Sequence, residues 1–436
     1  MIDTGHAFVS PDQLRVGLYI ELELGWMSHP FPKGSFKISS DRQIETLRGL
    51  GLKRVRYVPA KSDPEVQAQP APAPPRAHDG APAPPDADPA VEQPMAPQQP
   101  REIQHAALLQ AQRESLARCD QKFGSAIRRY EAVLEQLTTE PTQAGQECRE
   151  LVDEIVADVL GQGECSILLL SEGIADRTGM HPVNVTVLSL LLGDALGLSV
   201  EQLHILGTAA FLHDIGKTKL AERVRSMHTG LSPADLDAYQ GHVSHGLLLA
   251  KRLGLADGAA RAMAEHHELA DGSGFPRHIR GDAISIPGRI LALVNRYENM
   301  CNPSPRSPIA TPHEALSIIF SQSRARFDAA VLNAFIRMMG VYPPGSVVQL
   351  ANDRFALVVS VNSARPLKPR VLVHDPAVAR DQALVLDLEQ PGAPGIRRSV
   401  RPAVLPKATL DYLSPRQRIC YFFERAVLSG RTAGGA

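Results

Sequence analysis

Six side chains between residues 181 and 267 have the types and the spacing of a metal site. They are His181, His213, Asp214, His242, His266 and His267. Nitrogen and carboxylate ligands together suit a divalent transition metal such as Fe, Mn or Zn. A carboxylate such as that of Asp214 can also bridge two ions, and two ions can stabilise an in-line displacement at phosphorus. The set therefore predicts metal-assisted hydrolysis of a phosphate ester.

Each member of this set also has a structural interpretation. His181 precedes Pro182 and could cap a helix, while His213-Asp214 could be a solvated helix end. The adjacent pair His266-His267 does not prove a metal by itself, so the hypothesis depends on the whole set. Four other histidines lack such neighbours and are interpreted as structural: His204, His228, His245 and His278.

The elements that must position these residues are helices. From Glu147 to about Gly340 the apolar residues follow helical spacing nearly throughout, with breaks at glycine and proline. Successive ligand positions are about 24 to 32 residues apart, which is roughly one helix and its return. Antiparallel helices of that length bring such positions to one level of a bundle. We therefore expect an all-α helical bundle over residues 146–340.

The rest of the chain predicts four further segments. Residues 1–60 combine an alternating strand pattern with one capped helix, which indicates a small α+β domain. Residues 61–100 are rich in proline and alanine and predict a disordered linker. A connecting helix is expected over residues 101–145. Residues 341–436 contain short β-rich runs and predict a β-rich appendage, in which SPRQRICYFFERAVL is expected to form a terminal helix.

Composition and charge exclude several classes of protein. The 436 residues include 46 lysines and arginines against 47 acidic residues, so the net charge of −1 predicts neither a DNA nor a membrane partner. Five scattered cysteines are typical of reduced thiols in the cytosol. The N-terminus lacks the pattern of a signal peptide, and the longest apolar stretch is too short to span a bilayer. We expect a soluble, cytoplasmic protein.

Four ordered motifs resemble those of the HD-GYP family of cyclic di-GMP phosphodiesterases, within the HD metallophosphohydrolase superfamily. They are FLHDIGK at 211–217, QGHVSHG at 240–246, EHHELADGSGFP at 265–276 and IPGRILALVNRYENMCNP at 286–303. The N-terminal LRVGLYI, with the tryptophan and HPF that follow it, resembles an uncharacterised domain often found ahead of HD-GYP domains in bacterial proteins.

The resemblance implies hydrolysis of cyclic di-GMP to linear pGpG, to GMP or to both, by attack of a hydroxide that bridges two divalent metal ions, with Fe or Mn expected. The implied metal ligands are His181, His213, Asp214, His242, His266, His267 and Asn295. The implied catalytic residues are Asp214 and Lys217, since a lysine can neutralise charge on phosphoryl oxygens. The implied substrate-binding residues are Lys217, Arg289, Asp271, Gly272, Gly274, Phe275 and Pro276. A homodimer is left open, as is a diguanylate cyclase or adaptor protein bound through the GYP-like loop, residues 271–276.

The chain departs from the family pattern at several positions. Asn295 replaces an aspartate, Arg177 replaces a glutamate, and Phe275 replaces the tyrosine of GYP. The family's downstream basic pair has no match except the displaced Arg306. These departures favour a second hypothesis, a non-catalytic signalling module that acts as a nucleotide sensor or protein-interaction adaptor. A hydrolase of another nucleotide is a third hypothesis, although generic HD proteins lack the HHE and DGSGFP segment.

Overall fold

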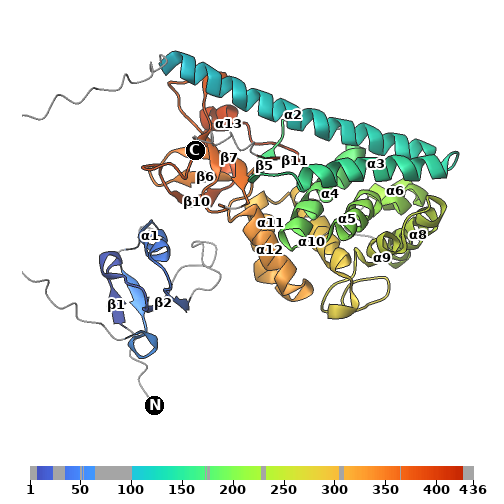
Figure 1. Ribbon diagram of the computed structural model, residues 1–436, viewed down its shortest axis with the longest axis horizontal. Helices are drawn as coiled ribbons and strands as arrows, with labels where there is room; N and C mark the ends of the chain where they lie inside the picture. The colour runs from blue at the N-terminus through green and yellow to red at the C-terminus, as the bar shows by residue number, and fades with distance from the viewer. Residues whose placement is uncertain are drawn as a thin grey trace, which may run out of the picture. The chain divides into compact units, whose positions relative to one another are not determined.

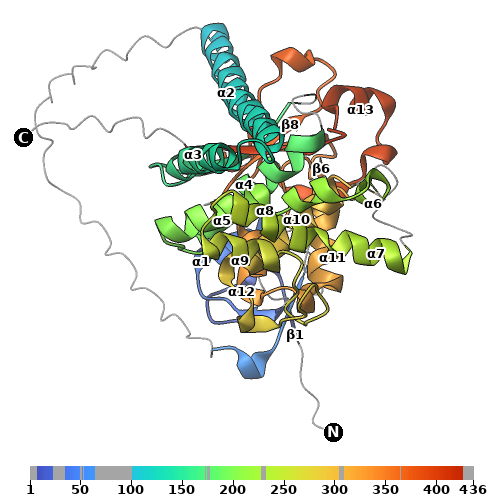
Figure 2. The same cartoon turned by 90° about the vertical axis from the view of Figure 1, so that its right-hand side faces the viewer.

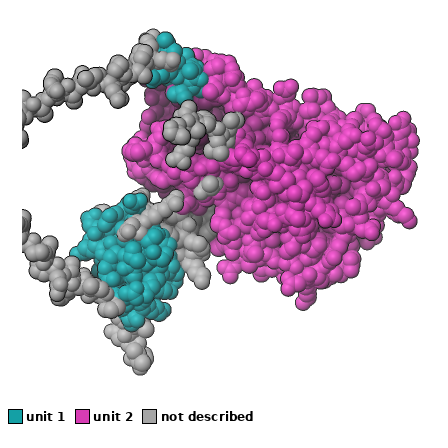
Figure 3. Space-filling view, in the orientation of Figure 1, with its two compact units in different colours: residues 1–108 teal, residues 109–436 magenta. Residues whose placement is uncertain are grey.

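The computed structural model describes residues 7–22, 35–49, 52, 54–63, 101–171, 173, 177–226, 232–303, 309–363 and 365–425. The chain divides into two compact units, residues 1–108 and residues 109–436 (Figure 3). Most of the predicted linker, residues 64–100, lies outside the described residues, as does Arg306.

Among its described residues, the N-terminal unit contains a small antiparallel sheet, one helix of its own and the first residues of the long helix that begins at Arg101. Its strands, in sheet order, are β1 (Ala7–Val9), β4 (Val55–Tyr57), β2 (Tyr19–Glu21) and β3 (Ser35–Lys37). Helix α1 (Asp41–Gly49) contributes Ile44 and Leu47 to a core that also contains Ile20. This is the α+β arrangement that the strand pattern and the capped helix predict.

Two long antiparallel helices replace the single connecting helix that the sequence predicts. Helix α2 (Arg101–Gln136) and helix α3 (Pro141–Val159) lie side by side in both views (Figures 1 and 2). Lys122 is ion-paired with Asp158 at 2.6 Å. The break comes directly before Pro141, because proline disfavours helix in the residue before it and fits the first turn of a new helix.

The bundle that carries the candidate ligands consists of nine helices among the described residues. They are α4 (Arg177–Ala195), α5 (Val200–Leu212), α6 (Glu222–Ser226), α7 (Pro233–Gln240), α8 (His242–Arg252), α9 (Asp257–Glu265), α10 (Ile286–Cys301), α11 (Pro312–Gln322) and α12 (Ala329–Met339). Leu188, Phe211 and Leu293 are fully buried in its core. Side chains of Ser199, Ser232, Ser285, Thr311 and Asp328 cap five of these helices, which satisfies backbone donors that would otherwise lack partners.

A seven-stranded antiparallel sheet packs at one end of this bundle (Figure 1). Its strands are β5 (Cys165–Leu169), β6 (Val347–Leu350), β7 (Phe355–Asn362), β8 (Arg370–Val373), β9 (Leu386–Asp387), β10 (Ile396–Val400) and β11 (Tyr421–Arg425), and the short helix α13 (Lys407–Leu413) precedes β11. The main order is β10-β6-β7-β5-β11, with β8 beside β7 and β9 beside β8. The sheet therefore joins a strand from the predicted all-α region to the C-terminal segment.

Two predictions for this part of the chain are wrong. The region 146–340 is not all-α, because it contains β5, and the expected terminal helix is instead the strand β11, paired with β5 from Tyr421–Leu169 to Arg425–Cys165. All five residues of β5 are buried. A short run that is apolar on both faces cannot be distinguished from a buried helical segment by periodicity alone.

All five cysteines are buried free thiols. Among the described residues, no helix combines the length and the apolar character that crossing a membrane requires.

Candidate metal centre

The six histidine and aspartate residues singled out by spacing converge at one place in the helical bundle. They form two groups that share one residue: His181, His213 and Asp214 in the first, and Asp214, His242, His266 and His267 in the second. Within each group, one ligand atom from every residue lies within 4.8 Å of the others. Each group therefore has the donor atoms and the spacing that one metal ion requires.

The carboxylate of Asp214 connects the two groups. Its Oδ2 atom lies 3.5 Å from Nε2 of His181 and 3.4 Å from Nε2 of His213. Its Oδ1 atom lies 3.6 Å from Nε2 of His242 and 3.7 Å from Nε2 of His266. Each oxygen thus faces one group, which is the arrangement of a carboxylate that bridges two cations.

Two buried polar atoms at this centre have no hydrogen-bond partner among the described residues. They are Oδ1 of Asp214 and Nε2 of His267. A buried polar atom that is left unpaired costs free energy, so such atoms in a folded protein need an explanation. A cation placed between them would supply the missing partner, and the residues present therefore fit a metal ion.

Helix ends position three of the imidazoles. Nδ1 of His213 contacts the carbonyl oxygen of Ala210 at 2.7 Å, and Nδ1 of His266 contacts that of Met263 at 2.6 Å. His242 makes the same contact with the carbonyl oxygen three residues earlier. The last carbonyls of a helix lack intrahelical partners, so each can accept from a histidine three residues on. With the proton held on Nδ1, Nε2 is left free to bind a metal.

Gly216 allows the segment after His213-Asp214 to approach the start of α8. A Cβ atom at Gly216 would lie 1.9 Å from the carbonyl oxygen of His242 and 2.4 Å from the backbone nitrogen of Gly246. Any larger residue would force these segments apart. The glycine in HDIGK therefore keeps His242 within reach of Asp214.

Burial and charge set the protonation of these residues. Burial lowers the pKa of His213 to about 4 and that of His242 to about 3, so both rings are neutral, as metal ligands must be. Burial also lowers the pKa of His181, but the carboxylates of Glu298 and Asp214 outweigh it and raise the value to about 9. Burial raises the pKa of Asp214, yet Lys217 and His213 bring it well below its ordinary range.

Lys217 lies directly beside the shared carboxylate. Its Nζ donates to Oδ2 of Asp214 at 2.6 Å and lies 5.3 Å from the centre of the Tyr239 ring. Burial lowers the pKa of Lys217, but Asp214 raises it above its ordinary value, so the ammonium group stays charged.

Glu298 is a functional candidate that the motif reasoning missed. Its buried carboxylate holds Nδ1 of His181, and it also accepts hydrogen bonds from Asn184 at 3.2 Å and Asn302 at 2.8 Å. Both asparagines also donate to the carbonyl oxygen of Ile419 at 2.8 Å. The available signal was an acidic residue three positions after Asn295, on the same face of the helix.

Asn295 lies beside the second group of ligands and is buried. Its Oδ1 atom accepts a hydrogen bond from Nδ2 of Asn299 at 2.6 Å, and the same amide nitrogen donates to the backbone oxygen of Asn295. Asn295 therefore presents an uncharged oxygen that already has a hydrogen-bond partner.

The GYP-like loop packs on the histidine pair. The Phe275 ring stacks on the His267 ring, with centroids 4.4 Å apart and planes 21° apart. A Cβ atom at Gly274 would lie 2.3 Å from the carbonyl oxygen of His267, so only glycine fits there. The buried carboxylate of Glu268 holds the loop by accepting from the backbone nitrogens of Arg277 and Ile279.

The remaining predicted substrate-binding residues are placed differently. Asp271, Gly272 and Pro276 belong to the same loop but do not line the cavity beside the metal centre. The guanidinium of Arg289 is held by Asp282 and Asp328, at 3.0 Å each. Arg289 is therefore part of the scaffold and not of the substrate site that we propose below.

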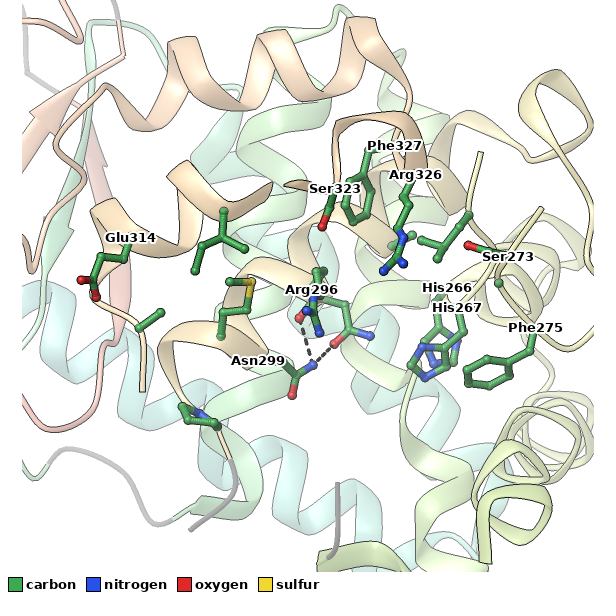
Figure 4. A pocket seen from close by; sticks show the side chains of 18 of the residues that line it. His266, His267, Ser273, Phe275, Arg296, Asn299, Glu314, Ser323, Arg326 and Phe327 are labelled. Atoms are coloured by element: carbon green, nitrogen blue, oxygen red, sulfur yellow. Dashed lines mark hydrogen bonds between the residues drawn. The ribbon is translucent and has the colours of Figure 1, made fainter. Parts of the chain in front are cut away.

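A cavity of about 780 Å³ opens beside the second group of ligands (Figure 4). His266, His267 and Phe275 lie at one end of it, and Glu314 lies at the other. Arg296 and Arg326 also line it. A volume of this size is typical of a site for a small organic ligand.

Two segments of the chain match models of known protein families. Residues 165–331 match the family model of the HD domain. This segment of the chain is similar to HD domains. Residues 8–148 match a second model, a domain of unknown function (DUF3391), so this match includes α2 and part of α3 as well as the N-terminal unit. The two matches confirm the resemblance at the level of an HD domain preceded by an uncharacterised domain.

Curated relatives of the chain are named as phosphodiesterases. It is 28% identical over 371 residues to a cyclic di-GMP phosphodiesterase of Pseudomonas aeruginosa, with 83% of each chain covered. It is 26% identical over 189 residues to a 3′3′-cGAMP-specific phosphodiesterase of Vibrio cholerae, which covers 42% of this chain and 44% of that protein. Among solved structures, an HDG"Y"P protein of Bdellovibrio bacteriovorus matches with a TM-score of 0.42 and 14% identity, covering 76% of this chain and 98% of that one.

Proposed function

We propose that this protein is a metal-dependent phosphodiesterase that hydrolyses a cyclic dinucleotide, cyclic di-GMP. The observation that carries the proposal is Asp214, whose two oxygens face two separate histidine groups and whose Oδ1 has no hydrogen-bond partner among the described residues. A shared carboxylate between two imidazole-rich groups is what a two-metal hydrolytic site requires. The names of the relatives support this class of substrate.

The chain would hold two divalent transition-metal ions, for which Fe and Mn are the expected identities. His181, His213 and Asp214 would bind one, and Asp214, His242, His266 and His267 would bind the other, with Asn295 as a further neutral ligand. Such ions lower the pKa of water and polarise phosphoryl oxygens.

The chain's own residues prepare this site for an anionic substrate. Asp214 stays ionised, and the ring nitrogens of His213 and His242 stay neutral and available. Lys217 is a fixed positive charge beside Asp214, where it would neutralise charge that develops on the phosphoryl oxygens. Phe275 holds the His267 ring and covers it from solvent on one side. The product would be linear pGpG, GMP or both.

One observation favours a second function. Asn295 brings no negative charge to the second group, and Asn299 already occupies one lone pair of its oxygen. A centre with this weaker ligand could bind nucleotide without turning it over. The chain would then act as a non-catalytic nucleotide sensor or protein-interaction adaptor.

An anaerobic assay with Mn or Fe and cyclic di-GMP separates the two functions. We expect turnover by the wild-type chain and a loss of more than about a hundredfold in His213→Ala, because even outer contacts of metal ligands are worth about 10- to 100-fold. His204→Ala, a partly exposed histidine outside the centre, is the matched control and should keep wild-type turnover. An inactive wild type that gains turnover in Asn295→Asp would replace the phosphodiesterase proposal with the sensor or adaptor function.

A further inference from the structure

The cavity beside the histidine pair contains two arginines that the metal centre does not use. Arg296 lies on α10, and Arg326 lies in the short helix after α11. Both line the cavity. Figure 4 shows both side chains directed into it, between His267 at one end and Glu314 at the other.

Neither guanidinium group has an ion pair or a side-chain hydrogen bond within the part of the chain that the structure describes. Other arginines nearby are paired. Arg289, on the same helix as Arg296, is held by two aspartates, and Arg401, in the same cavity, is held by Glu314. Arg296 and Arg326 are thus unneutralised charges at the wall of a cavity.

The two charges also act on each other. Arg296 and Arg326 are both exposed to solvent, and their like charges repel each other. Asp271 also responds to Arg326: hydrogen bonds from Ser273 lower its pKa, and Arg326 contributes in the same direction. No ion pair joins Asp271 to Arg326, and Oδ1 of Asp271 is occupied by Ser273. An anion in the cavity would relieve the repulsion between the two arginines.

We propose that Arg296 and Arg326 form a phosphate subsite for the second phosphodiester of a cyclic dinucleotide, the one that is not cleaved. The inference rests on the proposed function, which places the first phosphodiester at the metal centre. Guanidinium groups bind phosphate through paired N–H···O contacts and keep their charge at every physiological pH. His266 and His267 line the same cavity, so one ligand can contact both places. A substrate with a single phosphodiester leaves this subsite without an anion, so the arginine pair favours cyclic dinucleotides over simple diesters.

The test compares two substrates in the full-length, metal-loaded protein. Cyclic di-GMP has two phosphodiesters, and bis(p-nitrophenyl) phosphate has one. We expect Arg296→Gln and Arg326→Gln each to raise the KM for cyclic di-GMP by about tenfold, and the double variant by about a hundredfold, with a much smaller change in kcat. The ratio of kcat/KM for cyclic di-GMP to that for bis(p-nitrophenyl) phosphate should fall accordingly. Arg296→Lys should recover part of the loss. Arg324→Gln, an exposed arginine outside the cavity lining, should leave the ratio unchanged.

Different results would overturn the phosphate subsite and the phosphodiesterase proposal. Wild-type turnover of both substrates with an unchanged ratio in the double variant would overturn the subsite alone. If the wild type hydrolyses neither substrate, the phosphodiesterase proposal fails, and calorimetric titration with cyclic di-GMP still decides the subsite. A weaker Kd in the double variant than in Arg324→Gln supports the subsite, while equal affinities, or no binding by the wild type, overturn it.

Discussion

The two ligand groups around Asp214 are held in place by different kinds of contact. His242 and His266 are oriented by backbone carbonyls only three residues earlier in the chain, and His267 is stacked against Phe275 from the adjoining loop. His181 is instead held by Glu298, which is 117 residues away in the sequence. The second group is therefore supported locally, whereas the first contains one locally held ring, His213, and one ring, His181, whose support depends on tertiary structure.

The support of the first group extends to the C-terminal sheet. Asn184 and Asn302 each contact both Glu298 and the backbone of Ile419, two residues before β11. Asn184 also accepts from the backbone nitrogen of Tyr421, within β11. The position of His181 is thus linked to a strand that lies far outside the ligand motifs. A centre built this way is complete only when the C-terminal segment has folded onto the bundle.

The largest expected effect comes from removing the residue that both groups share. Asp214→Asn should lose both metal ions, as measured by elemental analysis, and lower turnover by about a thousandfold or more. It also leaves the partly buried ammonium group of Lys217 without its ion-pair partner, which costs up to about 3 kcal/mol of stability.

A double variant separates these two effects of Asp214→Asn. Asp214→Asn with Lys217→Met should regain stability in urea denaturation but not metal or turnover. Retention of one ion in either variant would show that the two groups are independent of Asp214.

The next effect distinguishes one group from the other. His266→Ala and His181→Ala should each reduce the metal content from two ions per chain to one, because each removes a ligand from only one group. Turnover should fall by about a hundredfold or more in both, since a two-metal site needs both ions. Loss of both ions in both variants would instead indicate a single cooperative centre.

A smaller effect is expected from the residue that supports His181. Glu298→Gln keeps the size of the side chain but removes the charge that orients the ring, so the affinity of the first group for metal should fall by about 10- to 100-fold. The second group should keep its ion. Metal titration with Mn should show one weakened site beside one unchanged site. Two equally weakened sites would show that Glu298 supports both ligand groups and not the first alone.

The link from Glu298 to the C-terminal sheet can be tested separately. Asn302→Ala should weaken the same metal site by less than Glu298→Gln does. It should also cost about 1–3 kcal/mol of stability, because the carbonyl and the N–H of Ile419 each lose a hydrogen bond. Unchanged metal affinity together with lost stability would show that Asn302 supports the fold and not the metal site.

The difference between local and long-range support also explains which parts of the site the sequence could predict. Helical spacing predicted the bundle, and the intervals between polar residues predicted that the six ligands would meet, as they do. Their binding of metal stays a prediction. Glu298 has only a weak signal in the sequence, because its role depends on α10 facing α4 across the core. Strand β11 was missed for a related reason, since its partner β5 lies far away in the sequence.

Charged residues were the least predictable part of the site. Arg289 has the right residue type, but two aspartates hold it in the scaffold. Arg296 lies inside the fourth motif at a position with no assigned role, and Arg326 lies in no motif. Their interest comes from lining a cavity without an acidic partner. An arginine is written in the same way in the sequence whether or not its guanidinium group has an acidic partner, so only the surrounding structure distinguishes the two cases.

The smallest expected effect concerns the stacked ring that supports the second group. Phe275→Tyr keeps the face of the ring on His267, so turnover and metal affinity should change by less than about twofold. Phe275→Ala removes the stack and should weaken the second metal site by about threefold to tenfold, in line with about 0.5–1.5 kcal/mol for an aromatic pair. Metal titration of the two variants checks this. A large effect of the tyrosine variant would mean that contacts beyond the stack decide the position of His267, and the support of the second group would then be no more local than that of the first.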